Sequence, residues 1–500
     1  MSAGAGLAAH LPALQVVLPL LSAPACVLLY HGARVWWLAM GVSTAAFVIA
    51  LALLAQVMGA GPVSYALGGW AAPWGIEYRV DALNALVLVL VSGVSSIALM
   101  FARDSVPREV AAERIYLFYT AWLLCLTGLL GIAVTGDAFN VFVFLEISSL
   151  ATYALVSFGS ERSALSAAFR YLVMGTIGGT CILIGVGLLY AMTGTLNMAD
   201  LAQRLEPLRD SAPVRAAFAF IFVGAGLKMA MFPLHAWLPG AYASAPSAAS
   251  VFIAATSTKV AVYVLLRFTF TIFGVEFSFD TLALAKVLTV FAAVGVFAAS
   301  LAAILQADLK RMLAWSSIAQ VGYMLIGIAT ANLDGLTASI VHLLNHALMK
   351  GALFMALGCV AYRIGAVRLD AVAGLARRMP WTFGAFALAG LSLVGVPFTA
   401  GFVSKWYLLL GVLHNGWWPL AVLLAVTSLM AVVYVGKVLE VAWFHTAAPG
   451  SVTERAREAP LSMLVPLWLL VLANLWFGVH TALPVGVARS AAAALLGLTL

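Results

Sequence analysis

The chain has 500 residues, of which 64% are hydrophobic and only 9% are charged, and its mean hydropathy is +1.07. Soluble globular proteins carry about 25% charged residues. The composition therefore excludes a soluble enzyme, a disordered tail protein and a nucleic-acid-binding protein. The formal net charge is +7, and the positions of the basic residues along the chain decide whether it points to an acidic partner.

Apolar stretches of about 20 residues, long enough to cross a lipid bilayer, follow one another along the chain. The first charged residue is Arg34, so no basic region precedes the first stretch, and we expect a retained span rather than a signal peptide. The apolar tail 484–500 is expected to lie on the membrane or to pack as a partial helix. The fourteen predicted spans are residues 13–30, 35–58, 81–101, 114–134, 138–158, 166–192, 215–233, 250–272, 281–303, 312–330, 336–361, 382–410, 417–440 and 461–482.

The basic residues predict how these spans are oriented. Five lysines fall within spans, and the other 21 lysines and arginines lie in loops or near span ends. If both termini lie outside the cytoplasm, fifteen of the 21 fall on the inner side. The six on the outer side are Arg79, Arg204, Arg209, Arg215, Arg267 and Arg489. This bias is typical of cytoplasmic loops, so we predict a multi-pass protein of the cell inner (plasma) membrane with both termini outside the cytoplasm.

Two of the predicted spans are interrupted. Pro233 and Pro239 fall at the end of the seventh span, where each removes a backbone donor and breaks the helix. The twelfth span contains the segment 395–401, Gly-Val-Pro-Phe-Thr-Ala-Gly. Backbone groups freed in this way are tolerated at membrane depth only where protein or a water-filled cavity satisfies them. Each break lies close to a lysine, Lys228 in the seventh span and Lys405 in the twelfth.

The spacing of the breaks predicts an internal repeat. They lie five spans apart, so spans 4–8 and 9–13 form two five-helix blocks that enter the membrane from opposite sides. The alternative is that proline and glycine merely kink ordinary spans. We predict an all-α polytopic integral membrane protein with about 14 transmembrane helices and two inverted five-helix repeats with broken helices 7 and 12. The predicted segments are an N-terminal three-helix segment at 1–113, the first repeat at 114–273, the inverted second repeat at 281–440, and a C-terminal helix and tail at 441–500.

Several ionisable residues fall at membrane depth, where a charge costs at least about 2.5–3.5 kcal/mol and so requires a reason. Histidine titrates near neutral pH, and a desolvated lysine can do so. His342, His346 and Lys350 share one helix face because they are spaced at i, i+4 and i+8. With water filling the gaps, these groups predict a lateral proton relay. Its members are Glu146, Lys228, Lys259, His346 and Lys405.

Other readings of these residues remain open. Glu146 and Lys228 also fit a fixed structural ion pair. Lys259 reaches the interface by snorkelling if its span is shifted, and snorkelling is the favoured reading for Lys286, which lies near the start of its span.

Four further residues are candidates for relay or support. His342 fits either the relay or a hydrogen-bonded core position, and Lys350 lies about three turns inside its span. Asp137, at a span end, fits a helix cap or an ion-entry site. His235 lies within the first break.

The sequence around these residues resembles the antiporter-like subunits of complex I (NADH–quinone oxidoreductase), membrane-bound hydrogenases and Mrp-type cation/proton antiporters. The resemblance covers spans 4 to 12. The stretches that carry it are 136–146 (GDAFNVFVFLE), 226–239 (GLKMAMFPLHAWLP), 245–259 (APSAASVFIAATSTK), 342–354 (HLLNHALMKGALF) and 401–407 (GFVSKWY).

The resemblance implies that the five relay residues hold the family's relay positions. A lysine after the second break is similar to the Mrp D-type subunit or to the L and N subunits of complex I, whereas the M type usually has a glutamate there. The sequence shows no long lateral C-terminal helix of the L type, and we expect a D-type subunit. The family often has an acidic residue after Trp-Leu-Pro, but here the residue is Gly240, so no entry role is expected at that position.

Three functions remain open on this basis. The first is a proton-translocating subunit of a hetero-oligomeric Mrp-type antiporter that exchanges Na⁺ or K⁺ for H⁺. The second is an M- or N-like pumping subunit of complex I or a hydrogenase, where other subunits carry the redox chemistry. The third is a self-sufficient transporter of a small organic solute. We expect no catalytic chemistry and no cofactor in this chain, which has no flavin, nucleotide or iron–sulfur motif. The four cysteines form no CxxC pair, so we expect no metal site either.

Overall fold

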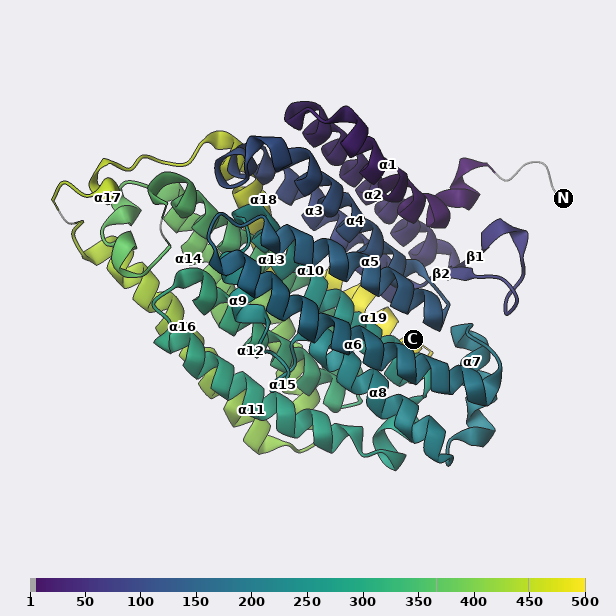
Figure 1. Ribbon diagram of the computed structural model, residues 1–500. Coiled ribbons are helices and arrows are strands. Elements are labelled where there is room, and N and C mark those ends of the chain that lie inside the picture. Colours follow the sequence, from purple (N-terminus) through teal and green to yellow (C-terminus); the bar gives the residue numbers. More distant parts are fainter. Residues whose placement is uncertain (1–5, 366, 448, 500) are drawn as a thin grey trace.

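The computed structural model describes residues 6–365, 367–447 and 449–499, and over these ranges the chain is almost entirely helical (Figure 1). The helices are α1 Leu11–Leu29, α2 Gly32–Ala60, α3 Ala82–Glu109, α4 Ile115–Val134, α5 Ala138–Ser157, α6 Ser163–Thr193, α7 Met198–Leu205, α8 Ala212–Met229, α9 Leu238–Ser244, α10 Ser247–Leu266, α11 Leu284–Leu305, α12 Leu309–Ala329, α13 Leu333–Ile364, α14 Pro380–Val394, α15 Ala400–His414, α16 Trp418–Phe444, α17 Val452–Arg455, α18 Leu461–Val479 and α19 Ala482–Leu496. Two strands, β1 Val63–Ala66 and β2 Glu77–Val80, pair antiparallel.

The helix lengths confirm a multi-pass membrane protein. Among the described residues, 13 helices are long and apolar enough to cross a membrane. The remaining predicted span is divided into α14 and α15, each 15 residues long. The count of about fourteen spans is therefore confirmed, and the apolar tail forms the helix α19.

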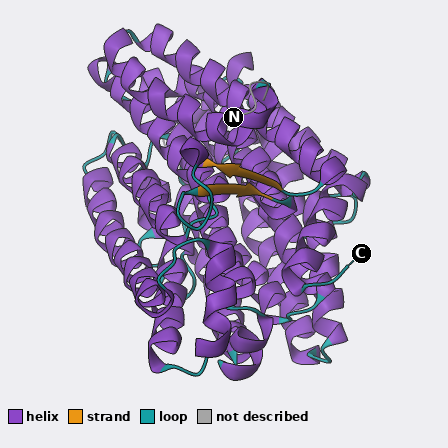
Figure 2. Ribbon diagram, turned by 90° about the vertical axis from the view of Figure 1, so that its right-hand side faces the viewer, coloured by secondary structure: helices purple, strands orange, loops and turns teal. Residues whose placement is uncertain are grey.

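The loops separate into two ends of the bundle. The β-hairpin and α7 lie at one end, and α17 lies at the other (Figure 1). In Figure 2, which views the molecule from the right-hand side of Figure 1, the strands face the viewer. We call the hairpin end the outer end and the α17 end the inner end.

Two positions of the first five-helix block have counterparts in the second at the same interval along the chain. Asp137 caps α5 and bridges to Asn197, while Asp308 caps α12 and bridges to Arg368. Position 308 follows 137 by 171 residues, and 368 follows 197 by the same interval. The first bridge lies with α7 at the outer end, whereas the second lies at the inner end, so the equivalent loops are on opposite sides, as inverted repeats require.

Both breaks occur where the sequence predicts them. The helix α8 ends at Met229, and the left-handed residue Ala230 turns the chain out of it. The indole Nε1 of Trp237 donates to the Leu227 carbonyl at 2.9 Å, which satisfies one freed backbone group. In the second repeat, α14 ends at Val394 and Gly395 takes a left-handed conformation with φ of +94°.

The most enclosed helices are α10, α12 and α13, in each of which 94% of the apolar window is buried. The peripheral helices α1, α2, α6, α11, α16 and α18 bury only 33–39% of theirs and present apolar side chains outward. The enclosed helices α10 and α13 carry Lys259, His342, His346 and Lys350. These polar side chains therefore lie in the centre of the bundle, away from the lipid-facing surface.

Candidate functional site

Glu146 and Lys228 meet across α5 and α8 in the first repeat. The Lys228 Nζ lies 3.3 Å from the Glu146 Oε1 and donates to the Ser149 Oγ at 2.7 Å. The side chain of Lys228 is 7% exposed and that of Glu146 is 24% exposed. The lysine is thus neutralised by a carboxylate in a largely enclosed setting, where an unpaired charge would be costly.

A glycine on α6 makes room for this pair, and the sequence alone does not single it out. A Cβ built on Gly179 would collide with the Glu146 Oε1 and would lie 3.7 Å from the Lys228 Nζ. No side chain fits there without displacing the carboxylate. The run of small residues in α6 is the sequence signal for close helix packing, but it does not show which glycine faces the glutamate.

Lys259 lies on α10 and is 1% exposed, so it does not snorkel to an interface. Its Nζ donates to the Ala254 carbonyl and lies 3.4 Å from the Thr258 Oγ1. A cavity of about 30 Å³, large enough for a water molecule, is lined by Lys228 and Ser257. The Ser257 Oγ has no hydrogen-bond partner within the described chain.

Two stacked histidines occupy the centre of α13. The rings of His342 and His346 lie 5.6 Å apart with an interplanar angle of 3°. His342 is hydrogen-bonded on both nitrogens, to the Ser404 Oγ at 2.7 Å and to the Gln320 Oε1 at 3.0 Å. Both ring nitrogens of His346 are buried and lack a partner among the residues described. The helix α10, which carries Lys259, packs against α13, which carries both histidines.

Lys350 lies one further turn along the same face of α13 and is fully buried. Its Nζ donates to the Leu313 carbonyl at 2.8 Å and to the Ser316 Oγ. These neutral partners join α13 to α12. Lys350 therefore lies beside a row of ionisable side chains that runs from Glu146 and Lys228 through Lys259 and the two histidines. No carboxylate contacts Lys350 in the described structure.

Lys405 closes the row at the second break. Its Nζ donates to the carbonyls of Leu393 and Val394, at 3.0 and 2.8 Å, and to the Ser428 Oγ at 3.0 Å. It also lies 5.0 Å from the centroid of the Tyr323 ring. A cavity of about 10 Å³ is lined by Lys405 and His342. Of the predicted residues, the core thus brings together seven, of which Glu146 and Lys405 are partly buried and the others buried: Glu146, Lys228, Lys259, His342, His346, Lys350 and Lys405.

Two predicted residues lie apart from this row. Asp137 caps α5 by accepting from the Asn140 N–H at 2.7 Å, about 13 Å along the helix from Glu146. Burial raises the pKa of Asp137, although backbone hydrogen bonds act in the opposite direction. His235 lies in the first break, where its ring stacks 5.0 Å from Phe232 and meets Trp315 edge-on. Lys286, by contrast, is exposed near the start of α11.

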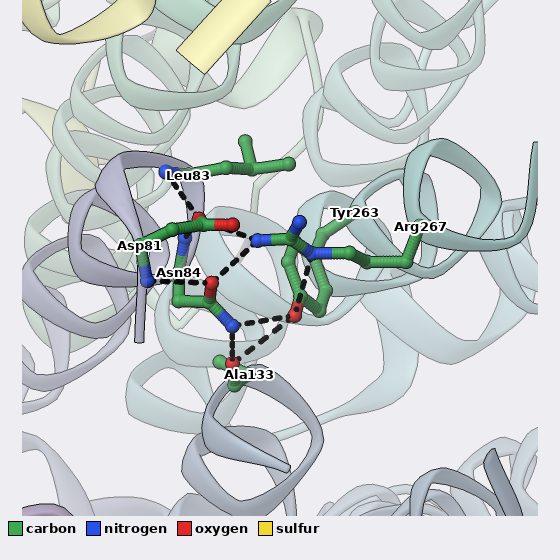
Figure 3. A network of polar contacts seen from close by, with 6 residues as sticks. All are labelled: Asp81, Leu83, Asn84, Ala133, Tyr263 and Arg267. Atoms are coloured by element: carbon green, nitrogen blue, oxygen red, sulfur yellow. Dashed lines mark hydrogen bonds and ion pairs between the residues drawn. The ribbon is translucent and has the colours of Figure 1, made fainter. Parts of the chain in front are cut away.

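A second polar cluster lies at the outer end of α10 (Figure 3). The Arg267 Nη2 lies 2.5 Å from the Asp81 Oδ1 and also donates to the Asn84 Oδ1. The Tyr263 hydroxyl accepts from the Arg267 Nε at 3.2 Å and donates to the Ala133 carbonyl at 3.1 Å. The cluster therefore ties α3, α4 and α10 together beneath a cavity of about 280 Å³.

The sequence pattern marks Arg267 only as an outer basic residue and gives no signal for Asp81. Burial alone would raise the pKa of Asp81, but the Arg267 guanidinium and the backbone N–H groups of Asn84 and Leu83 hold that pKa below its usual range. Asp81 thus carries its charge in the folded protein.

Comparison with known proteins places this arrangement in a well-defined group. Residues 135–431 match the family model described as NADH:quinone oxidoreductase/Mrp antiporter, transmembrane. The chain is 44% identical over 486 residues to a protein named as the N subunit of an NADH-quinone oxidoreductase from Desulforudis audaxviator, covering 92% of this chain and 94% of that protein. It is 30% identical over 409 residues to a protein named as the D-type subunit of a Na⁺/H⁺ antiporter from Alkalihalophilus pseudofirmus, covering 81% and 82%.

Two solved structures share the fold. A chain of the Mrp complex from Dietzia superimposes with a TM-score of 0.88 at 27% identity, covering 98% of both chains. A chain of the membrane-bound sulfane sulfur reductase, an archaeal respiratory membrane complex, gives a TM-score of 0.88 at 31% identity, covering 97% of this chain and 98% of that one. Both neighbours are chains of multisubunit membrane assemblies.

Proposed function

The chain belongs to the NADH:quinone oxidoreductase/Mrp antiporter transmembrane family, and from this premise we propose that it is the proton-translocating membrane subunit of a multisubunit Mrp-type antiporter. It exchanges Na⁺ or K⁺ for H⁺ together with other membrane subunits. The observation that carries the proposal is the buried row of ionisable side chains between the two helix breaks, from Glu146 to Lys405.

The proposed relay runs from Glu146 and Lys228 through Lys259 and His346 to Lys405. A carboxylate stabilises the charged form of a lysine beside it, so a change in their separation releases or captures a proton. The cavity of about 30 Å³ beside Lys228 is large enough for a water molecule that completes the proton path there, and the one of about 10 Å³ beside Lys405 is at the lower limit for a single water. His346 suits the central step because both of its ring nitrogens are free of other described partners.

A second candidate is an N-like pumping subunit of an NADH–quinone oxidoreductase or a related respiratory complex. The observation in its favour is the 44% identity to the protein named as an N subunit, against 30% to the one named as a D-type antiporter subunit. The match to the Mrp chain, with a TM-score of 0.88, supports the first candidate. The relay is common to both, and the candidates differ in the subunits that surround it.

We further propose that the protein lies in the plasma membrane with both termini outside the cytoplasm. The count of fifteen inner basic residues against six outer ones supports this orientation. The proposed segments are 1–113, 114–273, 281–440 and 441–500. The helix order supports these divisions, since α3 ends at Glu109 and α16 ends at Phe444.

Purification of the native complex separates the candidates. An Mrp-type antiporter is expected to contain only membrane subunits and to exchange Na⁺ or K⁺ for H⁺ in vesicles without a redox substrate. Iron–sulfur proteins that co-purify in fixed ratio, with proton transport that requires electron transfer, would replace the first candidate with the second. Solute transport by this chain alone in liposomes would contradict both.

A further inference from the structure

A large cavity opens at the inner end, where the two repeats meet. Its volume is about 710 Å³, and it lies among the inner ends of α6, α9, α11 and α12. In Figure 1, α9 and α12 are seen between the longer helices α6 and α11. The side chains that characterise it are Arg170, His235, Trp237, Gln306, Arg311 and Trp315. None of these belongs to the buried row described above.

The charged groups of this cavity are basic. Arg170 and Arg311 are exposed, and neither guanidinium takes part in an ion pair or a hydrogen bond within the described chain. The His235 Nδ1 is buried and likewise has no partner there. Among the described residues that line the cavity there is no aspartate or glutamate, and the carboxylate of Glu161 accepts from the lining Ser163 at 3.0 Å. A cavity lined by these three nitrogen-bearing side chains, with no carboxylate among its lining residues, favours the binding of an anion.

The position of the cavity matches the headgroup level of a membrane. The helices α6 and α12 begin beside it, so Arg170 lies two turns and Arg311 less than one turn from the inner end. Trp315 lines it and is partly exposed, and tryptophan is the residue typical of membrane–water interfaces.

Apolar side chains continue from the cavity toward the middle of the bilayer. Val173 and Ile177, which follow Arg170 on the same side of α6, are exposed, as are Phe297 and Leu301 on α11. An anion that binds in the cavity therefore has two exposed apolar helix faces beside it, which suit acyl chains. A soluble anion would make no contact with them.

We propose that this cavity binds the phosphate headgroup of an anionic phospholipid. Arg170 and Arg311 would hold the phosphate oxygens, and the acyl chains would run along α6 and α11. The lipid would then link α6 and α9 of the first repeat to α12 of the second, directly beneath the first helix break. Basic pockets between transmembrane helices on the cytoplasmic side are a known way to select anionic headgroups.

Native mass spectrometry of the purified full-length chain tests this assignment. The protein is incubated with phosphatidylglycerol or with phosphatidylcholine of the same acyl chains. We expect one phosphatidylglycerol to be retained in preference to phosphatidylcholine. Removing a cation near the surface weakens such binding about fivefold, so Arg170→Gln and Arg311→Gln should each lower retention by that factor, and Arg311→Lys should restore most of it.

Arg377→Gln is the matched control, because Arg377 is also exposed at the inner end but does not line the cavity. Arg311→Gln alone keeps the test valid if Arg170→Gln fails to fold, since Arg311 is exposed on the first turn of α12. Equal retention by Arg311→Gln and Arg377→Gln would overturn the proposal. Displacement of the lipid by millimolar inorganic phosphate would overturn its assignment to a lipid.

Discussion

The two helix breaks hold their lysines in different ways. In the first repeat, Lys228 precedes the break and pairs with the carboxylate of Glu146 at 3.3 Å. In the second repeat, Lys405 follows the break and donates to two carbonyls at the end of α14. The ion pairs of the described chain do not include Lys405. One lysine is thus balanced by a full negative charge and the other by the partial negative charge of a helix C-terminus.

This difference indicates that each repeat places a lysine near its helix break but supplies it with a different electrostatic partner. A carboxylate that moves away leaves an unbalanced ammonium, whereas carbonyl dipoles fixed at a helix end remain in place. Transport should therefore be strongly reduced by the change of one side chain, Glu146, in the first repeat. In the second repeat, transport should depend more on the backbone geometry at the end of α14.

The largest predicted effect on transport is the same in both repeats. Lys228→Ala and Lys405→Ala should each abolish coupled transport, because each removes an obligatory proton-carrying group. Ion exchange by the assembled complex in vesicles measures this. Lys286→Ala is the control, since Lys286 is exposed, and it should retain most of the activity. Wild-type exchange by both core variants would remove the basis of the relay.

Substituting the groups that contact the two lysines should affect transport differently in the two repeats. Glu146→Gln removes the full charge beside Lys228, which changes the lysine's proton affinity by at least about tenfold and should slow transport comparably. Ser428→Ala removes one of three hydrogen-bond acceptors of Lys405 and leaves both carbonyls, so its effect should be smaller than that of Glu146→Gln. Transport rates over a range of pH provide the comparison, and equal effects would contradict the electrostatic distinction.

Transport should be sensitive to the substitution of two glycines, because an added Cβ would collide with the relay side chains. A Cβ at Gly179 would collide with the Glu146 carboxylate, and a Cβ at Gly395 would lie 2.8 Å from the Lys405 Cδ in a backbone with φ of +94°. We expect Gly179→Ala and Gly395→Ala to reduce transport several-fold. Gly187→Ala is the control on α6, because nothing lies within 4 Å of its Cβ position. A Gly179→Ala variant as active as Gly187→Ala would show that the carboxylate tolerates displacement.

Two ion pairs at the outer end of the bundle also differ, and the property expected to report this difference is the stability of the fold. Asp81 and Arg267 form a mostly buried pair, whereas the Asp334–His414 pair, at 3.0 Å, leaves the histidine 62% exposed. Arg267→Ala should destabilise the fold by about 3 kcal/mol, the low end for a broken buried pair, because Asp81 is 24% exposed. His414→Ala should cost less than about 1 kcal/mol. Thermal unfolding in detergent compares them.

The same pair predicts a pH dependence. Because the pKa of Asp81 is lower in the folded chain than in the unfolded one, its contribution to stability is present above the unfolded value of about 3.9 and is lost as the pH falls through the folded pKa. The wild type should therefore lose stability below about pH 4 more steeply than Asp81→Asn. Parallel pH profiles of the two proteins would show that the carboxylate is not stabilised by folding.

Much of the architecture could be predicted from local signals in the sequence. Hydropathy located the spans, and Pro233, Pro239 and Gly395 located the breaks, because these residues act on the backbone where they stand. The interior position of Lys259 followed from the cost of a charge in lipid.

The partners of these residues were harder to predict. Asp81 and Arg267 are 186 positions apart, and neither carries a local signal that it faces the other. Gly179 is one of several glycines in α6, and its role depends on the rotation of α6 against α5. Contacts of this kind are set by the packing of whole helices, which the pattern of one sequence does not specify.

Lys259 provides the most direct test of the relay, because it lies on α10, which packs against α8, the helix of Lys228, and against α13, the helix of the two histidines. Lys259→Met keeps the length and apolar stem of the side chain and removes only the group that carries a proton. Proton movement into vesicles that contain the assembled complex should be lost, while the complex still assembles as in the wild type. Lys286→Met is the control, and it should keep wild-type proton movement. Wild-type proton movement by an assembled Lys259→Met complex would contradict the relay.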